Sequence, residues 1–151
     1  LSIRRQRQMC IRDRGKSRVI TVPADIQKLW NDVRVILRNP VIARYELKED
    51  IQLGKKAGIT ALCEYSLLSD NEYPTYAITK KEITESGIRK MKQVHSGEEI
   101  GCVVLELGYF IDFKNKKLED PLSVTLSLTE SEKQDERIGI SIKRMLEEYV
   151  W

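Results

Sequence analysis

Apolar residues recur along this chain in two periods, one typical of helices and the other of strands. Between Ile26 and Leu37 they fall at three- and four-residue steps, which predicts a helix with Trp30 buried on its face and Pro40 as its stop. Other apolar runs predict strands over residues 17–22, 41–47, 75–78 and 102–110. This mixture predicts an α+β domain, a small mixed sheet packed with about four helices around one core.

Two further helices are predicted from apolar periodicity alone. The first covers residues 59–68, and its common side holds Ile59, Leu62, Cys63 and Leu67. The second closes the chain, and its common side holds Ile138, Ile142, Met145, Leu146 and Tyr149. The residues from Gly54 to Gly58 are expected to form a polar turn, and those from Ser131 to Arg137 a polar link.

Helix-start signals mark two other segments. Thr79 and Glu82 have the spacing of a capping box, so a helical turn is expected to follow. Asp120-Pro121 is a good helix start because proline is preorganised for the first helical position. The residues from Leu122 to Leu128 nevertheless alternate as a strand would, and we favour the helix.

The first fourteen residues do not fit the pattern of the rest. They show neither period, position 1 is not Met, and residues 7–14 (Arg-Gln-Met-Cys-Ile-Arg-Asp-Arg) resemble translated sequencing-adaptor sequence. We therefore interpret residues 1–14 as a non-native artefact and residues 15–25 as a linker or the remnant of a truncated upstream domain. Residues 26–151 are then a single α+β domain whose N-terminal module is missing. The alternative for the opening segment is a basic arm that grips phosphates.

The charge balance depends on that interpretation. The whole chain has 26 Lys and Arg against 23 Asp and Glu, a net charge of +3. Without residues 1–14 there are 21 basic and 22 acidic residues, a net charge of −1. The remaining chain has no global charge that favours nucleic acid. The removed basic residues are Arg4, Arg5, Arg7, Arg12 and Arg14.

Cysteine usage and hydropathy bear on the compartment. Cys10, Cys63 and Cys102 are scattered without a CxxC or CxxH pair, which suits a reducing cytoplasm, and Cys63 and Cys102 are expected to be buried. No apolar run approaches the ~20 residues that span a bilayer, and no secretory signal is recognisable. We therefore expect a cytoplasmic protein with no membrane partner.

The search for catalytic chemistry yields one alternative. Restriction-type nucleases place a Glu on a central strand with a Lys two residues later, so that both meet Mg²⁺ and the attacking water. Glu106 lies on such a strand, but Gly108 takes the position of the Lys. His95 is the single histidine and is expected to be an exposed loop residue. We assign no catalytic, metal-binding or cofactor-binding residue, and no small-molecule ligand is implied.

Two other groups of residues are expected to be structural. The acidic pairs Glu98/Glu99 and Glu147/Glu148 are interpreted as solvated faces. Four tyrosines could form a stacking surface for bases, but without interleaved Lys and Arg they are expected in the core or at its rim. These tyrosines are Tyr65, Tyr73, Tyr76 and Tyr109.

Three stretches together resemble a known family. They are residues 29–41, residues 57–62 with Tyr73-Pro74-Thr75-Tyr76-Ala77, and residues 120–128 with Asp135-Glu136-Arg137 and the closing helix. Over residues 26–151 the chain resembles the C-terminal region of bacterial winged-helix, MarR-like proteins, which are similar to type IV abortive-infection (AbiEi-type) antitoxins. The resemblance implies an N-terminal winged helix that binds promoter DNA, absent here, and a nucleotidyltransferase-type toxin encoded next door. It marks Ala61–Leu62 and Asp120–Leu128 as core, and no DNA-binding residue can be carried over.

Three hypotheses about function follow. The first is the non-catalytic C-terminal domain of a transcriptional regulator or antitoxin, which acts through protein contacts and reaches DNA only through the missing module. The second is a metal-dependent, restriction-type nuclease domain centred on Glu106. The third is an interaction domain unrelated to nucleic acid.

Overall fold

The computed structural model describes residues 10–14, 17–21, 24–69, 71–111 and 114–151, with side chains described from residue 24 onward. The chain divides into two units, one that runs to Leu37 and includes Trp151, and one that covers Arg38–Val150. The first predicted helix therefore belongs to the first unit and not to the unit that carries the sheet. The interpretation of residues 1–14 as non-native falls partly on residues 1–9, which lie outside the described residues, as do residues 15–16 and 22–23 of the expected linker.

The first unit contains two antiparallel strands and a helix. Strand β1 (Cys10–Arg14) pairs with β2 (Ser17–Thr21), with Cys10 opposite Thr21. The strand predicted over residues 17–22 is confirmed as β2. Strand β1 was not predicted, because backbone pairing with a neighbour can form a strand where the side chains show no alternation. Helix α1 (Ile26–Val33) follows, and its cap is Asp25, whose carboxylate accepts a hydrogen bond from the backbone N of Lys28 at 2.9 Å.

Helix α1 is shorter than its periodicity predicts. It ends at Val33, and Ile36, expected on the buried face, is 79% exposed. Pro40, predicted to stop this helix, lies well past its end, and proline constrains only the residue directly before it, so that prediction is wrong. The prediction for Trp30 is confirmed, because its side chain is 6% exposed.

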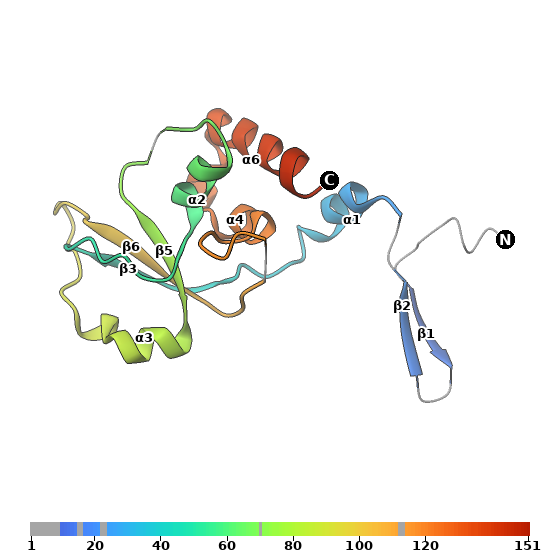
Figure 1. The fold of residues 1–151 in the computed structure, drawn as a ribbon, viewed down its shortest axis with the longest axis horizontal. Helices are drawn as coiled ribbons and strands as arrows, with labels where there is room; N and C mark the ends of the chain where they lie inside the picture. Colours follow the sequence, from blue (N-terminus) through green and yellow to red (C-terminus); the bar gives the residue numbers. More distant parts are fainter. Residues whose placement is uncertain (1–9, 15–16, 22–23, 70, 112–113) are drawn as a thin grey trace. The chain divides into compact units, whose positions relative to one another are not determined.

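The second unit is built on a four-stranded mixed sheet with the order β3-β6-β5-β4 (Figure 1). Its strands are β3 (Val41–Leu47), β4 (Lys55–Lys56), β5 (Thr75–Thr79) and β6 (Cys102–Leu107). Central strand β6 runs antiparallel to β3 and parallel to β5, and all six of its residues are buried. The predicted α+β class with a small mixed sheet is therefore confirmed.

Helices cover both faces of this sheet (Figure 1). The connection from β5 to β6 contains α3 (Lys80–Ser86) and the 3₁₀ turn η2 (Ile88–Lys90), whose Ile83 and Ile88 pack with Cys102 and Val104. On the opposite face lie α2 (Gly58–Tyr65), α4 (Pro121–Ser127) and α6 (Glu136–Tyr149), which contact one another. Cys102 and Val104 of β6 therefore pack in the core on the α3 side of the sheet, and Val103, Leu105 and Leu107 pack in the core on the other side.

The helices of the second unit include one that the sequence pattern did not predict. Helix α5 (Glu130–Lys133) occupies part of the expected polar link, because Thr129 and Glu132 form a capping box that supports a short turn without an apolar face. The capping box of Thr79 and Glu82 is confirmed at the start of α3. With α5, the described residues contain six α-helices, more than the number expected.

Helix α2 presents a different face from the predicted one. It ends at Tyr65 instead of Leu68, and Leu67 is 87% exposed. Four of its buried positions, Gly58, Ala61, Leu62 and Tyr65, follow helical steps, and Thr60 is buried beside them. Leu62 alone of the predicted side is fully buried, and the expectation that Ala61 and Leu62 lie in the core is confirmed.

Residues 120–128 showed both a helix start and strand-like alternation, and the structure has the favoured helix there, α4. Pro121 occupies its first turn, and the Asp120 carboxylate accepts a hydrogen bond from the backbone N of Ser123 at 2.9 Å. The segment is core, as expected, although Ser123, Thr125 and Ser127 are among its buried residues. Buried hydroxyls in a helix need acceptors, and Thr125 Oγ1 donates to the Pro121 carbonyl at 2.9 Å.

The expected turn between Gly54 and Gly58 contains the short edge strand β4. Its outer side is covered by another segment, because Lys56 N donates to the Lys117 carbonyl and Glu119 N donates to the Lys56 carbonyl, both at 2.9 Å. This edge of the sheet is therefore closed by the chain itself. Within the described part of the chain, the other edge, β3, is covered in this way at its C-terminal end, where Val94 N donates to the Glu46 carbonyl at 2.9 Å.

Candidate functional site

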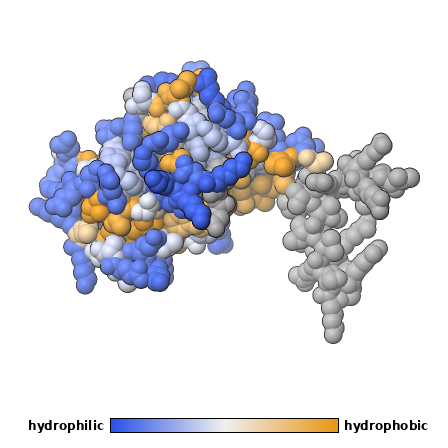
Figure 2. All heavy atoms as spheres, in the orientation of Figure 1, coloured by the Kyte–Doolittle hydropathy of each residue, from blue (hydrophilic) through white to orange (hydrophobic). Residues whose placement is uncertain are grey.

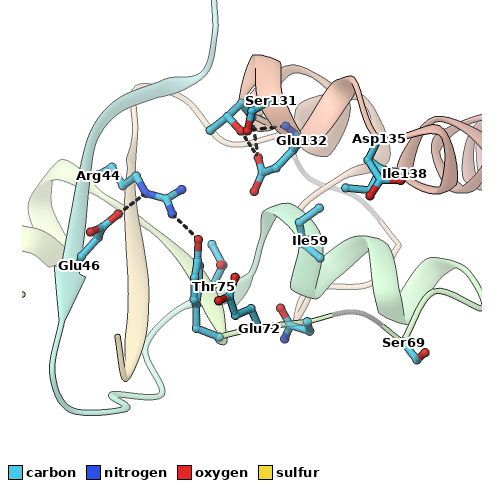
Figure 3. Close-up of a pocket in the computed structure, with 13 residues that line it drawn as sticks. Arg44, Glu46, Ile59, Ser69, Glu72, Thr75, Ser131, Glu132, Asp135 and Ile138 are labelled. Carbon is cyan, nitrogen blue, oxygen red and sulfur yellow. Dashed lines mark hydrogen bonds and ion pairs between the residues drawn. The ribbon is translucent and has the colours of Figure 1, made fainter. Parts of the chain in front are cut away.

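An open groove of about 860 Å³ lies on the face of the sheet that carries α2 and α6 (Figure 3). Arg44 and Glu46 of β3 border one side of it and Asp135 and Ile138 of the α5–α6 region the other, with Ile59 of α2 between them. Its volume is in the range of ligand and peptide sites. The lining residues are Arg44, Glu46, Ile59, Ser69, Asn71, Glu72, Tyr73, Thr75, Thr129, Ser131, Glu132, Asp135 and Ile138.

Arg44 is held in place on the β3 side of the groove (Figure 3). Its Nε donates to Glu46 Oε1 at 3.1 Å and its Nη2 donates to the Tyr73 hydroxyl at 3.0 Å. The guanidinium carbon also lies 5.9 Å from the centroid of the Tyr73 ring. These contacts neutralise Glu46 and fix a cation against an aromatic ring, which defines one end of the site.

The carboxylates on the opposite wall serve as helix caps. Glu132 Oε2 accepts hydrogen bonds from Thr129 N at 2.6 Å and from Thr129 Oγ1 at 2.8 Å. Asp135 caps α6 and accepts from the backbone N of Arg137 at 2.8 Å. The Arg137 guanidinium, 3.0 Å away, lowers the pKa of Asp135 by hydrogen bonding, so this carboxylate stays ionised.

The lining of the groove is acidic. Among the described residues that line it are the carboxylates of Glu46, Glu72, Glu132 and Asp135 and one guanidinium, that of Arg44. Glu72 is exposed in the loop that leads to β5, and no described residue forms an ion pair with it. Such a lining attracts cationic groups and repels phosphates.

Glu106, the residue of the nuclease alternative, lies on the other face of the sheet. Its side chain is 2% exposed, and Oε2 accepts a hydrogen bond from the Tyr45 hydroxyl at 2.9 Å. Arg89 Nη2 donates to the same carboxylate at 3.2 Å. The negative charge of Glu106 is thus compensated by the Arg89 guanidinium, next to the core that contains Val104. This arrangement fits a structural role, in which a buried carboxylate anchors η2 to the sheet.

We expect Glu106→Gln to lower the free energy of unfolding by about 1–2 kcal/mol, because an amide keeps an acceptor for Tyr45 but loses the ion pair with Arg89. Urea denaturation followed by circular dichroism measures this change. The comparison is Tyr45→Phe, which keeps the ion pair and removes both hydrogen bonds of the Tyr45 hydroxyl, the one to Glu106 and the one from Arg89, and we expect about 1–2 kcal/mol. A Mg²⁺-dependent nuclease activity that Glu106→Gln abolishes would contradict the structural role.

Glu119 is a buried carboxylate that the sequence did not single out. It is 1% exposed, and its Oε2 accepts from Gly58 N at 3.2 Å and from Ser127 Oγ at 3.3 Å. Its Oε1 has no hydrogen-bond partner among the described residues. Burial raises the pKa of Glu119 to about 7, and the neighbouring Asp120 adds to the shift.

The position of Glu119 follows from a missing cap. The N-cap of α2 is Ala57, which has no side chain that could accept from the first turn. Glu119 supplies the acceptor from a distant segment, and its backbone carbonyl accepts from the Tyr65 hydroxyl at 2.9 Å. The absence of a capping side chain at the start of α2 is therefore the sequence feature that indicates a hydrogen-bond acceptor from elsewhere in the chain.

The other residues singled out from the sequence do not gather at one site. His95 is exposed in a loop, as expected, and its backbone N donates to Glu98 Oε2 at 2.9 Å. Both acidic pairs are exposed, as predicted, and Glu98 also pairs with Lys48. Cys102 is buried, whereas Cys63, predicted to be buried, is only half-buried.

The four tyrosines occupy separate environments instead of one stacking surface. Tyr65 and Tyr76 are buried, with their hydroxyls on the Glu119 carbonyl and the Asp50 carboxylate. Tyr73 lies in the groove and Tyr109 is 42% exposed. The expectation that they pack in the core or at its rim is confirmed for Tyr65, Tyr73 and Tyr76.

The described residues contain no group of three or more His, Cys, Asp or Glu side chains that could hold a metal ion. No helix within the described ranges combines the length and the apolar character needed to cross a bilayer. Hydrophilic residues make up much of the visible face of the second unit (Figure 2). The fold and the groove thus define a small α+β domain with an acidic surface site.

Comparison of the chain with models of protein families, with curated proteins and with solved structures finds no match.

Proposed function

We propose that this chain is the non-catalytic C-terminal domain of a bacterial transcriptional regulator or antitoxin and that it acts through protein contacts. The groove carries this proposal. It is open and polar, and three of its four carboxylates cap helices or pair with Arg44 instead of converging on a reaction centre. A surface of this kind suits a partner protein better than a small substrate, which is normally enclosed.

The charge of the groove also supports the assignment of DNA binding to a separate domain. Phosphate contacts from Lys and Arg supply most of the affinity for DNA, and the groove offers one guanidinium among four carboxylates. In the proposed protein, DNA binding belongs to an N-terminal winged helix. The resemblance of residues 26–151 to regulator and antitoxin C-terminal regions is the second support, and it suggests a nucleotidyltransferase-type toxin as the partner.

The partner can be tested by co-purification. We expect the tagged chain to retain the purified nucleotidyltransferase encoded beside its own gene, and a variant with a charge-reversed groove, Glu72→Lys with Glu132→Lys, to retain less of it. A chain that carries Glu99→Lys with Glu148→Lys, two exposed sites outside the groove, is the matched control. Failure of the parent chain to retain the toxin would count against the toxin as partner and favour an interaction domain unrelated to it.

DNA binding provides an independent test. At about 150 mM salt we expect the chain to bind duplex DNA no more tightly than nonspecific proteins do, with Kd values above about 1 μM. Any binding is expected to disappear when the arginines of residues 1–14 are replaced by glutamine, as fluorescence anisotropy would show. Sequence-specific, nanomolar binding that survives these replacements would contradict the assignment of DNA binding to a separate domain.

A further inference from the structure

The outer edge of β3 has backbone groups that the described residues leave unpaired. Val103 N donates to the carbonyl of Pro74, directly before β5, so the backbone groups of Val103 face β5 and point away from β3. Its opposite residue, Glu46, must then point away from β6, which agrees with its bond from Val94 N. By the two-residue alternation, Arg44 also points outward, and its N–H and C=O have no backbone partner among the described residues.

This open edge borders the acidic groove. Arg44 and Glu46 line the groove with their side chains, while the backbone of Arg44 faces outward from the sheet. A strand added beside β3 would lie about 4.8 Å away, and every second side chain would point to the groove side of the sheet. The outer edge of β3 and the groove are therefore two parts of one surface.

We infer that this surface binds an extended segment of a partner protein whose alternate residues are Lys or Arg, with the segment pairing along β3 at Arg44. This inference rests on the proposed function and names the chemistry of the partner. Backbone bonds to the edge supply affinity for any extended chain, and the groove selects the side chains.

Charge complementarity decides the kind of segment. Glu46 is paired with Arg44 and Asp135 with Arg137, so Glu72 and Glu132 are the lining carboxylates without a cationic partner among the described residues. Two ammonium or guanidinium groups from the segment would balance them. A phosphate backbone or an acidic segment would meet the carboxylates of Glu72 and Glu132 and is disfavoured.

The test uses a fluorescein-labelled peptide of about nine residues in which lysine alternates with threonine and valine, a pattern that places all charges on one face of a strand. We expect anisotropy to show a Kd in the range of about 10–100 μM with the full chain, weakening as salt rises. The same peptide with glutamate in place of lysine is expected to bind at least about tenfold more weakly. Equal affinity for both peptides would overturn the selection by charge.

Charge-neutral variants locate the site. Glu72→Gln with Glu132→Gln is expected to weaken the lysine peptide about tenfold. Gln can still complete the capping box with Thr129, so α5 is retained. Glu99→Gln with Glu148→Gln removes as many charges from exposed positions outside the groove, and we expect less than about a twofold change. Equal losses in the two double variants would place the peptide elsewhere.

Residue-level amide hydrogen exchange tests strand pairing without any substitution. Saturating lysine peptide is expected to slow exchange of the Arg44 amide by at least about tenfold, while the Tyr45 amide, which faces β6, stays unchanged. As a second readout, Arg44→Pro removes the outward N–H and is expected to lose the peptide. Unaltered exchange at Arg44 under saturation would overturn strand addition.

These outcomes separate the inference from the proposed function. If the nucleotidyltransferase is retained equally by the parent and by Glu72→Gln with Glu132→Gln, and the peptide does not bind, the groove inference fails, while toxin binding through another surface of the chain stands. If the peptide binds as described and the nucleotidyltransferase does not, the inference stands and the assigned partner fails. A dimer of the chain that blocks the Arg44 amide without peptide would also overturn the inference, because the edge would then be a self-contact.

Discussion

Gly54→Ala is expected to lower the free energy of unfolding by about 3 kcal/mol. Gly54 has φ of +74°, and an added Cβ would overlap the Cγ2 of Ile78 and the carbonyl oxygen of Ala77. Both obstacles belong to β5, which pairs with β4 directly after Gly54. Neither can move without disturbing the sheet, so the strain of a left-handed alanine adds to the overlap. Urea denaturation followed by circular dichroism measures the loss.

Gly139→Ala is the matched control. Gly139 lies in the exposed first half of α6, and an added Cβ would meet nothing within 4 Å. Alanine is the better helix former, so we expect the free energy of unfolding to rise by about 0.5–1 kcal/mol. Equal effects of the two substitutions would mean that Gly54 does not lie against β5 as described.

Glu119→Gln is expected to stabilise the protein above neutral pH. The pKa of Glu119 is raised from 4.5 to about 7 in the folded state, so between these values the native state keeps a proton that the unfolded state has released. Stability from this group is therefore greatest at acid pH and falls as pH rises toward 7, by about 3 kcal/mol in total. Glutamine removes the ionisation and keeps an acceptor for Gly58 N. The variant is expected to exceed the parent by about 2–3 kcal/mol more at pH ~8.5 than at pH ~5.

The charged and titratable groups around Glu119 come from several elements. Asp120, the next residue, raises the pKa of Glu119, and Lys55 of β4 lowers it. The charge of Glu119 in turn raises the pKa of Tyr65 in α2 and of Tyr109 after β6. Subtracting the parent curve from that of the variant cancels their own titrations to first order. Glu99→Gln, at an exposed site, is expected to follow the parent across the pH range. A difference that does not change with pH would contradict the raised pKa.

The sequence pattern located the elements whose formation depends on apolar side chains. Strands β3 and β5 and helix α6 lie where apolar runs or helical periodicity predict them, and β6 ends at Leu107, before the end of the strand predicted over residues 102–110. Strand β4 escaped prediction because Lys55 and Lys56 are held by backbone bonds to β5 and to residues 117–119, which leave no trace in hydropathy. Helix α1 was overestimated for the opposite reason, since apolar periodicity continued past Val33 although the chain did not remain helical.

The groove could not be predicted, because its residues are ordinary types brought together only by the fold. Arg44 and Asp135 are far apart in sequence, and each has a local role, in an ion pair and in a helix cap. Glu106 stands out in the sequence because a carboxylate on an apolar strand is unusual. Its partners, Tyr45 and Arg89, cannot be predicted from their spacing in the sequence. Glu119 was overlooked because Glu-Asp-Pro is typical of an exposed turn.

The central position of β6 has a consequence for synthesis on the ribosome. Strands β3 and β5 leave the exit tunnel first, but neither pairs with the other, since β6 lies between them and is made after both. Until Leu107 has emerged, the apolar side chains of both strands have no completed core to enter, and they depend on the solubility of the nascent segment or on a chaperone. The polar loops and lysine-rich stretches that flank these strands would then protect the unfinished chain during translation.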